Sequence, residues 1–286
     1  MAAIVLDGAA AAREVYAGLK ERVAKLTRAN VRPGLAAVLV GDNPASRIYI
    51  RNKVRACTEA GVHSEVHALP ATTSRGELVE TLVQLNDDPE VHGILVQLPL
   101  PAHLEDTVVA TTLAGEKDVD GLTWQNLGAL ISGRPRFEPC TPRGIMKLLE
   151  RAGVPVEGKQ AVVVGRSTIV GKPMAMMLTA RSATVTICHS RTADLPAHTT
   201  RADILVAATG HANLITAKMV KPGAAVIDVG INRSTTGIVG DVDFAAVAEV
   251  AGWITPVPGG VGPMTIAMVI ENTVTAAERS ATRPSA

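Results

Sequence analysis

The chain has 286 residues, of which 47% are hydrophobic and 19% are charged, and its 28 Lys and Arg against 27 Asp and Glu leave a net charge of +1. This length predicts about two domains. The near-neutral charge argues against DNA, RNA or an anionic membrane as the main partner, because such partners need a strong positive field. Aromatic residues make up only 2% of the chain, so we expect no stacking platform for bases.

The cysteines and the N-terminal residues indicate the cellular compartment in which the protein works. Cys57, Cys140 and Cys188 are far apart and odd in number, which is typical neither of a disulfide framework nor of a zinc motif. The first residues lack the basic region of a signal peptide, and no apolar run approaches the roughly 18 residues that cross a bilayer. We therefore expect a reduced, soluble, cytoplasmic protein. Its dispersed histidines predict no metal site.

Short apolar runs alternate with longer amphipathic stretches. These runs span residues 35–40, 62–69, 93–97, 161–164, 184–187, 204–207 and 224–229. Such alternation predicts an α/β fold with parallel sheets. Ser74 with Glu77 three residues later indicates a capping box at a helix start, and Thr141 followed by Pro142 predicts another helix with proline at its first position.

Two breaks interrupt this alternation. The proline-rich segment between Ile131 and Gly144 predicts a domain boundary, which we place after residue 139. The second break, TPVPGGVGP at 255–263, precedes a final amphipathic helix from about residue 264 to residue 279.

The segment from Ala161 to Met177 has the pattern of a buried strand, a glycine turn and a helix. In this geometry the N–H groups of a helix N-terminus bind phosphate. The spacing from Gly165 to Gly171 departs from G-x-G-x-x-G, so an ordinary tight turn remains an alternative. Arg166 and Ser167 would offer a cation and a hydroxyl to an anionic group.

Three later turns complete the nucleotide pattern. Ser190 and Arg191 occupy the place of the acidic residue that would hold a ribose 2′-hydroxyl. They suit a 2′-phosphate and favour NADP over NAD, although Arg191 could also be a solvated loop charge. The other two turns, Thr209–Gly210 and Gly230–Ile231, follow predicted strands, where ligands collect in doubly wound sheets; each alone is an ordinary glycine turn.

A helix predicted between Gly41 and Gly61 carries several polar groups on one face. Ser46, Tyr49, Lys53 and Cys57 recur at intervals of three and four residues, which places them together. Lys53 is either one more solvated cation or an amine that loses its proton near neutrality when it is desolvated and can then shuttle protons. Tyr49 could orient it.

Two further polar residues have open interpretations. Gln97 ends an otherwise apolar strand, and because an unpaired polar group is costly there, it either satisfies backbone groups or points into a site. Asp120 lies in the glycine-ended loop KDVDG. It is either an acceptor for a ligand N–H group or a turn-forming residue before glycine.

Together these patterns resemble the bifunctional methylenetetrahydrofolate dehydrogenase/methenyltetrahydrofolate cyclohydrolase family. The matching stretches, in family order, are YIRNK from Tyr49, VQLPLP from Val96, KDVDG from Lys117, PCTPRG from Pro139, VVVGRSTIVGKP from Val162, CHSRT from Cys188 and PGGVGPMT from Pro258. The resemblance implies an α/β folate-binding catalytic domain at residues 1–139, completed by a returning C-terminal helix at 264–286. It implies a Rossmann-type NADP-binding domain at 140–263.

The resemblance also implies an activity. Hydride would pass from 5,10-methylenetetrahydrofolate to NADP⁺, and water would then open the resulting 5,10-methenyltetrahydrofolate to 10-formyltetrahydrofolate. The family is usually homodimeric through the cofactor domains. Two alternatives stay open: a dehydrogenase with inefficient hydrolysis, and a non-catalytic nucleotide- or folate-binding protein of the same fold.

Site residues follow from the resemblance position by position. Lys53 matches the catalytic lysine of the cyclohydrolase step, and Tyr49 matches the tyrosine that stacks near the pterin and helps to position it. Gln97 matches the glutamine that maintains the lysine's protonation state, and Asp120 the carboxylate that binds the pterin. The other residues implied to bind substrate are Leu98, Pro99, Gly259, Gly260 and Pro263. The residues implied to bind NADP are Gly165, Arg166, Ser167, Ser190 and Arg191 near the phosphates, and Thr209, Gly210 and Ile231 near the nicotinamide and ribose.

Overall fold

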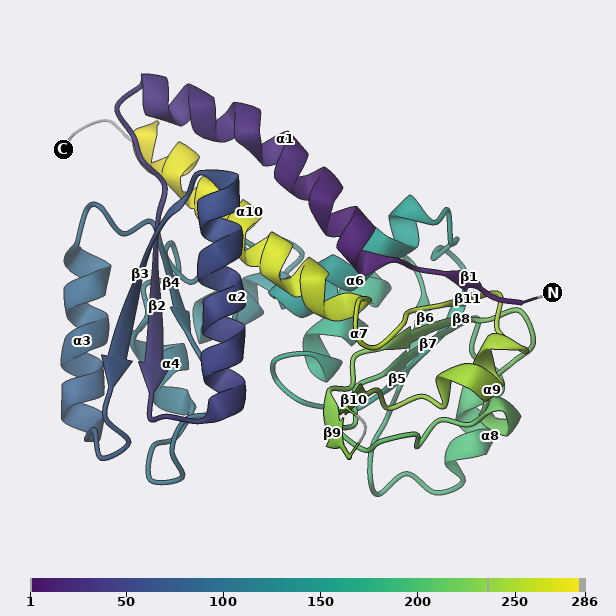
Figure 1. Ribbon diagram of the computed structural model, residues 1–286. Coiled ribbons are helices and arrows are strands. Elements are labelled where there is room, and N and C mark those ends of the chain that lie inside the picture. The colour runs from purple at the N-terminus through teal and green to yellow at the C-terminus, as the bar shows by residue number, and fades with distance from the viewer. Residues whose placement is uncertain (1, 236, 283–286) are drawn as a thin grey trace. The chain divides into compact units, whose positions relative to one another are not determined.

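The computed structural model describes residues 2–235 and 237–282, which divide into two compact units (Figure 1). Of the described residues, the three-stranded unit contains 14–140 and 266–282, and the six-stranded unit contains 2–13, 141–235 and 237–265. We had grouped residues 1–139 together, whereas the structure groups residues 2–13 with the six-stranded unit. Residues 283–286, which we had included in the C-terminal segment, lie outside the described residues.

The three-stranded unit is built on a parallel sheet with the strand order β3-β2-β4. Its strands are β2 (Gly34–Val40), β3 (His63–Leu69) and β4 (Gly93–Val96), so the strands predicted in this half are confirmed. The central strand β2 is buried along its whole length, because helices cover both faces of a parallel sheet. This explains its uninterrupted apolar sequence.

Helices pack against this sheet. They are α2 (Pro44–Ala60), α3 (Arg75–Asp87), α4 (Thr107–Thr112) and α5 (Trp124–Ile131). In Figure 1, α2 and α3 lie on opposite sides of the sheet. Alternate residues of β2 (Ala36, Val38 and Val40) pack with Leu78 and Leu82 of α3 in one core cluster, as the two-residue period of a strand requires.

The C-terminal helix α10 (Val261–Ala281) returns to the three-stranded unit, as we expected. The Asn272 side chain donates a hydrogen bond of 2.8 Å to the Val119 carbonyl. Arg22 of α1 (Gly8–Arg28) donates to both carboxylate oxygens of Glu278, at 2.9 and 2.6 Å. A bidentate pair of this kind fixes orientation as well as distance.

The six-stranded unit is a parallel sheet with the order β1-β11-β8-β7-β5-β6. Its strands are β1 (Ile4–Val5), β5 (Gln160–Val164), β6 (Thr184–Cys188), β7 (Ile204–Ala207), β8 (Ala225–Asp228) and β11 (Trp253–Ile254). The four predicted strands in this half are confirmed. We had not predicted β1 or β11, which pair with each other across the sequence.

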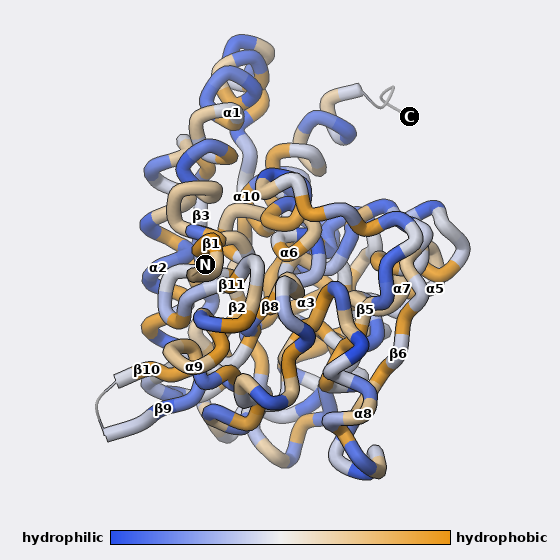
Figure 2. Tube along the Cα trace, turned by 90° about the vertical axis from the view of Figure 1, so that its right-hand side faces the viewer, coloured by the Kyte–Doolittle hydropathy of each residue, from blue (hydrophilic) through white to orange (hydrophobic). Residues whose placement is uncertain are grey.

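The helical segments of this unit are α6 (Cys140–Arg151), α7 (Gly171–Ala180), α8 (Leu195–Thr199), α9 (Phe244–Ala248) and a short 3₁₀ helix, η1 (Ala217–Met219). A hairpin of β9 (Asn232–Ser234) and β10 (Gly237–Val239) follows β8. Figure 2 shows hydrophobic colour along the buried strand β8 and alternating colours along α1. None of the helices described is long and apolar enough to cross a membrane.

The predicted helix starts had mixed outcomes. The capping box is confirmed: Glu77 N donates to Ser74 Oγ at 3.3 Å, and Ser74 N donates to Glu77 Oε2 at 2.7 Å. The prediction that Pro142 occupies the first helical position is wrong, because α6 already begins at Cys140. Proline is tolerated there because the N–H groups of the first turn have no intrahelical partner.

The capping box gives a stability prediction. Ser74→Ala should lower the free energy of unfolding by about 1 kcal/mol, because it leaves an N–H group at the start of α3 without its acceptor. Chemical denaturation would measure the change. Gln84→Ala, an exposed change in the same helix, should shift the same free energy by less than about 0.5 kcal/mol. Equal effects of the two changes would contradict the assigned role of Ser74.

Candidate functional site

Helix α2 buries the face that carries its polar side chains. Ser46, Lys53 and Cys57 are buried, with Lys53 only 7% exposed, and Tyr49 is half-buried. The predicted common face is therefore confirmed. Lys53 is not a solvated cation of this helix, since a solvated lysine would keep its amine in water.

Gln97 is the hydrogen-bond partner of Lys53. The Lys53 Nζ donates to Gln97 Oε1 at 3.1 Å, and Gln97 Nε2 donates to the Leu98 carbonyl at 2.7 Å. The Gln97 backbone N–H donates to the Val38 carbonyl at 2.9 Å, which holds the residue at the end of β4. Both interpretations of Gln97 are thus realised, because its amide nitrogen satisfies backbone and its amide oxygen points at the lysine.

Burial and charge act on Lys53 and Asp120 in opposite directions. Burial lowers the pKa of Lys53, and the Asp120 carboxylate partly opposes this by favouring the ammonium form. Burial raises the pKa of Asp120, and the Lys53 ammonium opposes that in turn. Desolvation disfavours both charged forms, whereas the attraction between the two groups favours them. The pKa of Lys53 is thus lowered and that of Asp120 is raised, so the two values lie closer together than they do in water.

The loop KDVDG assigns different tasks to its two aspartates. Asp118, which is 1% exposed, accepts hydrogen bonds from the backbone N–H groups of Gly121, Leu122 and Thr123 at 3.0, 3.1 and 2.7 Å. Its Oδ2 also accepts from Asn126 Nδ2 at 2.8 Å. Asp118 therefore builds the turn, and Asp120 is the aspartate whose charge acts on Lys53.

Cys140 belongs to this cluster, although its sequence pattern alone did not indicate it. The buried thiol donates to the Val119 carbonyl at 3.1 Å. The same thiol acts on both charged groups of the cluster, since it lowers the pKa of Asp120 and raises the pKa of Lys53. Only its position in PCTPRG singles it out, because no local spacing relates residue 140 to residue 53.

The neighbouring predicted substrate residues differ in exposure. Leu98 is partly buried and packs against the core cluster of the sheet. Pro99 is exposed, and the peptide bond that precedes it is cis. Of these two side chains, Pro99 is therefore the more accessible to a ligand.

In the six-stranded unit, a glycine turn joins β5 to α7. Gly165 has a φ of 133°, and a Cβ atom there would overlap the Ala208 carbonyl oxygen, so only glycine fits. Ser167 Oγ accepts from the Val170 and Gly171 N–H groups at 3.1 and 3.3 Å and so orders the turn that leads into α7. The Ser167 hydroxyl hydrogen takes no part in these two bonds, and Arg166 beside it is exposed.

The turn after β6 presents Ser190 and Arg191, both exposed, at the neighbouring strand end. His189 orders this turn: its N–H donates to Thr192 Oγ1 at 2.9 Å, and its Nδ1 accepts from the Arg191 N–H at 3.2 Å. The turn therefore has a fixed backbone that offers a hydroxyl and a guanidinium to solvent.

The remaining predicted residues also lie in the six-stranded unit. Thr209 and Gly210 donate their N–H groups to the carboxylate of Asp241, which we had not predicted to be a site residue. Ile231 is 48% exposed.

The last three predicted substrate residues are Gly259, Gly260 and Pro263, which fall at the start of α10 and just before it. Ala9 N donates to the Gly259 carbonyl at 3.0 Å.

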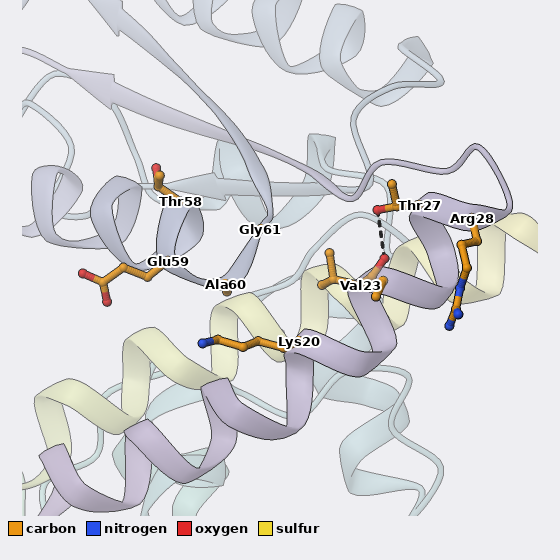
Figure 3. A pocket seen from close by; sticks show the side chains of 9 residues that line it. Lys20, Val23, Thr27, Arg28, Thr58, Glu59, Ala60 and Gly61 are labelled. Atoms are coloured by element: carbon orange, nitrogen blue, oxygen red, sulfur yellow. Dashed lines mark hydrogen bonds between the residues drawn. The ribbon is translucent and has the colours of Figure 1, made fainter.

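A separate hollow of about 550 Å³ lies on the three-stranded unit between α1 and α2 (Figure 3). Its lining residues are Lys20, Val23, Ala24, Thr27, Arg28, Thr58, Glu59, Ala60 and Gly61. It contains none of the predicted site residues. Within 2–235 and 237–282, no group of three His, Cys, Asp or Glu side chains could hold a metal ion.

The fold and the two sets of residues define a class: an α/β protein with a Rossmann-type nucleotide-binding unit and a buried lysine–carboxylate centre. Residues 6–120 match the family model described as tetrahydrofolate dehydrogenase/cyclohydrolase, catalytic domain, and residues 139–281 match its NAD(P)-binding domain. The chain therefore belongs to the tetrahydrofolate dehydrogenase/cyclohydrolase family, and both the predicted family and the predicted fold class are confirmed.

Individual relatives agree over nearly their whole length. A bifunctional protein FolD from Moorella thermoacetica is 60% identical over 98% of this chain and 100% of its own. The crystal structure of the bifunctional FolD enzyme from Campylobacter jejuni has a TM-score of 0.95 and 48% identity, covering 97% of this chain and 99% of its own. The Trypanosoma brucei enzyme, solved with NADP and an inhibitor, has a TM-score of 0.95 and 38% identity, covering 99% and 100%.

The electrostatics of the cluster give a direct prediction. Lys53 should titrate below its ordinary value of 10.5, and Asp120→Asn should lower its pKa further, because the change removes the carboxylate that stabilises the ammonium form. NMR of ¹³C-labelled lysine ε-carbons would follow the titration. Cys57→Ala should have a smaller effect, since the Cys57 thiol acts more weakly on Lys53 than Asp120 does. A rise in the Lys53 pKa on removal of Asp120 would contradict this assignment.

Proposed function

We propose that the protein is a bifunctional enzyme of one-carbon folate metabolism. It oxidises 5,10-methylenetetrahydrofolate to 5,10-methenyltetrahydrofolate with NADP⁺ and then hydrolyses the product to 10-formyltetrahydrofolate. The observation that carries the proposal is the environment of Lys53. This buried lysine donates a hydrogen bond to Gln97, and the charge of Asp120 acts on its pKa. A proton acceptor of this kind is needed for hydrolysis and not for hydride transfer.

The residues of the six-stranded unit fit NADP. A Cβ atom at position 165 would overlap the Ala208 carbonyl oxygen, so glycine keeps the turn after β5 tight and leads the chain directly to the N-terminus of α7, where backbone N–H groups can bind phosphate. In this proposal Gly165, Arg166 and Ser167 bind the phosphates, and Ser190 and Arg191 bind the 2′-phosphate of the adenosine ribose. Thr209, Gly210 and Ile231 contact the nicotinamide and its ribose. When bound, NADP⁺ supplies the hydride acceptor.

The chain's own groups perform the remaining tasks. Tyr49 and Asp120 hold the pterin, together with Leu98, Pro99, Gly259, Gly260 and Pro263 as further folate contacts. Lys53, whose pKa is lowered by burial, takes a proton from the water that attacks the methenyl carbon. Gln97 fixes the direction of the amine, because the Lys53 ammonium donates to its carbonyl oxygen. Asp120 stabilises the ammonium ion that forms.

The same proposal covers the domains, the cellular location and the oligomeric state of the protein. The folate-binding catalytic domain takes the part of residues 1–139 that lies in the three-stranded unit, with the C-terminal segment, and the NADP-binding domain takes residues 140–263 together with residues 2–13, which the structure groups with the six-stranded unit. The protein acts in the cytoplasm as a homodimer formed through the cofactor domains. The exposed edge strand β6, on which Ile187 is 38% exposed, supports such a dimer, because unpaired edges invite pairing with a second chain.

One time course tests the two activities together. With 5,10-methylenetetrahydrofolate and NADP⁺, the wild type should form reduced cofactor while the methenyl chromophore stays low. Lys53→Met should accumulate the methenyl product, with hydrolysis reduced roughly 100-fold or more, because the general base is lost. Lys25→Met, a change at an exposed lysine of the same unit, should behave as the wild type.

The outcomes separate the alternatives. Methenylfolate that accumulates with the wild type would indicate a dehydrogenase without effective hydrolysis. Absence of any reduced cofactor would favour a binding protein. Unchanged hydrolysis by Lys53→Met would exclude Lys53 as the proton acceptor.

Cofactor preference gives a separate prediction. Arg191→Ala should weaken binding of NADP⁺ by about 10- to 100-fold, which is the effect of losing a hydrogen bond to a charged group, and should leave NAD⁺ binding almost unchanged. Calorimetric titration with both cofactors would measure this. Arg201→Ala, at another exposed arginine of the unit, is the control. Equal losses for the two cofactors would show that Arg191 does not contact the 2′-phosphate.

A further inference from the structure

Two buried carboxylates lie beneath the strand ends of the six-stranded unit. Asp228 ends β8 and is 3% exposed, and Asp241 follows β10 and is fully buried. Neither belongs to the set that the sequence pointed to. A buried charge is retained only where hydrogen bonds offset its lost hydration, so the partners of these two groups indicate what they do.

Asp241 connects two loops. Its Oδ2 accepts the N–H groups of Thr209 and Gly210 at 2.5 and 3.0 Å, and its Oδ1 accepts from Asn232 Nδ2 at 2.9 Å. Thr209 and Gly210 follow β7, whereas Asn232 begins β9 directly after Ile231. One carboxylate therefore sets the distance between the turn after β7 and the segment after β8.

Asp228 binds the backbone on both sides of the loop that carries Asp241. It accepts the backbone N–H groups of Gly230, Asp241 and Val242 at 2.9, 2.9 and 3.0 Å. Burial raises its pKa to about 6. Two glycines allow the backbone to come close to both carboxylates. A Cβ atom on Gly230 would overlap Asp241 Oδ1, and a Cβ atom on Gly240 would overlap Asp228 Oδ2. The position of Asp241 is thus fixed by its surroundings.

The two loops that Asp241 joins differ in what they expose. On one side, Ile231 exposes 48% of its surface next to Asn232. On the other side of the carboxylate lies the turn of Thr209 and Gly210. An exposed aliphatic side chain suits the flat ring of a nicotinamide, and its distance from the turn decides how that ring is held. Small displacements of this kind strongly affect hydride transfer, which depends on orientation.

We propose that Asp241 is a positioning residue that holds the Thr209–Gly210 turn and the Ile231–Asn232 segment in the spacing needed for the nicotinamide end of NADP. The proposal rests on the proposed function, since it assumes that these loops contact the cofactor. Asp241 acts through backbone and amide groups and does not touch the reacting atoms. Its effect should therefore fall on the nicotinamide half of the cofactor and spare the adenosine half.

A swap of partners tests the proposal. Asn232→Asp sets a second carboxylate against Asp241 Oδ1, so it replaces a hydrogen bond with repulsion. It should lower kcat/KM for the dehydrogenase by roughly 10- to 100-fold, as a displaced reacting group does. The double change Asp241→Asn with Asn232→Asp restores one amide donor facing one carboxylate and should recover most of the activity. Asn213→Asp adds the same charge at an exposed side chain and should have no effect.

Two readouts separate positioning from general damage. Calorimetry should show weaker binding of NADP⁺ to Asn232→Asp and unchanged binding of adenosine 2′,5′-bisphosphate, which lacks the nicotinamide. Hydrolysis of 5,10-methenyltetrahydrofolate, which needs no cofactor, should keep its wild-type rate.

The contrary results are distinct. Equal losses of binding for NADP⁺ and the bisphosphate, or a double variant no better than Asn232→Asp, would overturn the positioning role. Unchanged dehydrogenase kinetics in Asn232→Asp would also overturn it. A wild-type protein that does not reduce NADP⁺ would overturn the proposed function itself.

Discussion

The direction of the parallel strands is the constraint on which both units depend. In a parallel sheet every strand ends at the same edge, and the N–H groups within the strands are already bonded to their neighbours. Gln97 follows β4, Gly165 follows β5 and Thr209 lies just beyond β7. The polar groups that remain available are therefore gathered at one edge of each sheet, although they are far apart in sequence.

Lys53 is the exception, because it comes from the helix α2. Its amine reaches the strand edge through the Gln97 side chain, and the surrounding packing removes water from it. Burial lowers the pKa of this amine, and the charge of Asp120 partly opposes that shift. Both effects act on the lysine that the proposed hydrolysis uses as its proton acceptor.

The sequence predicted those features that depend on local order. Periodicity identified the seven longer strands, and Ser74 with Glu77 identified a cap, because each depends on residues a few positions apart. The pairing of Ile4 with Trp253 has no local signal, so β1 could not be foreseen.

The same limit applies to the candidate site. The common face of Lys53 and Cys57 was predictable from helical spacing, whereas their burial depends on the packed sheet. Cys140 and Asp241 could not be found from spacing, because their partners lie many residues away in the sequence. The resemblance to a family supplied the functional meaning that periodicity could not.

The structure also separates residues that support loops from residues available for chemistry. Asp118 and Asp241 each accept several N–H groups, so their carboxylate oxygens are occupied in holding backbone. Asp120 differs, since its charge faces Lys53 and burial raises its pKa. Two aspartates of one pentapeptide are thus distinguished by their hydrogen-bond partners, and composition alone could not have told them apart.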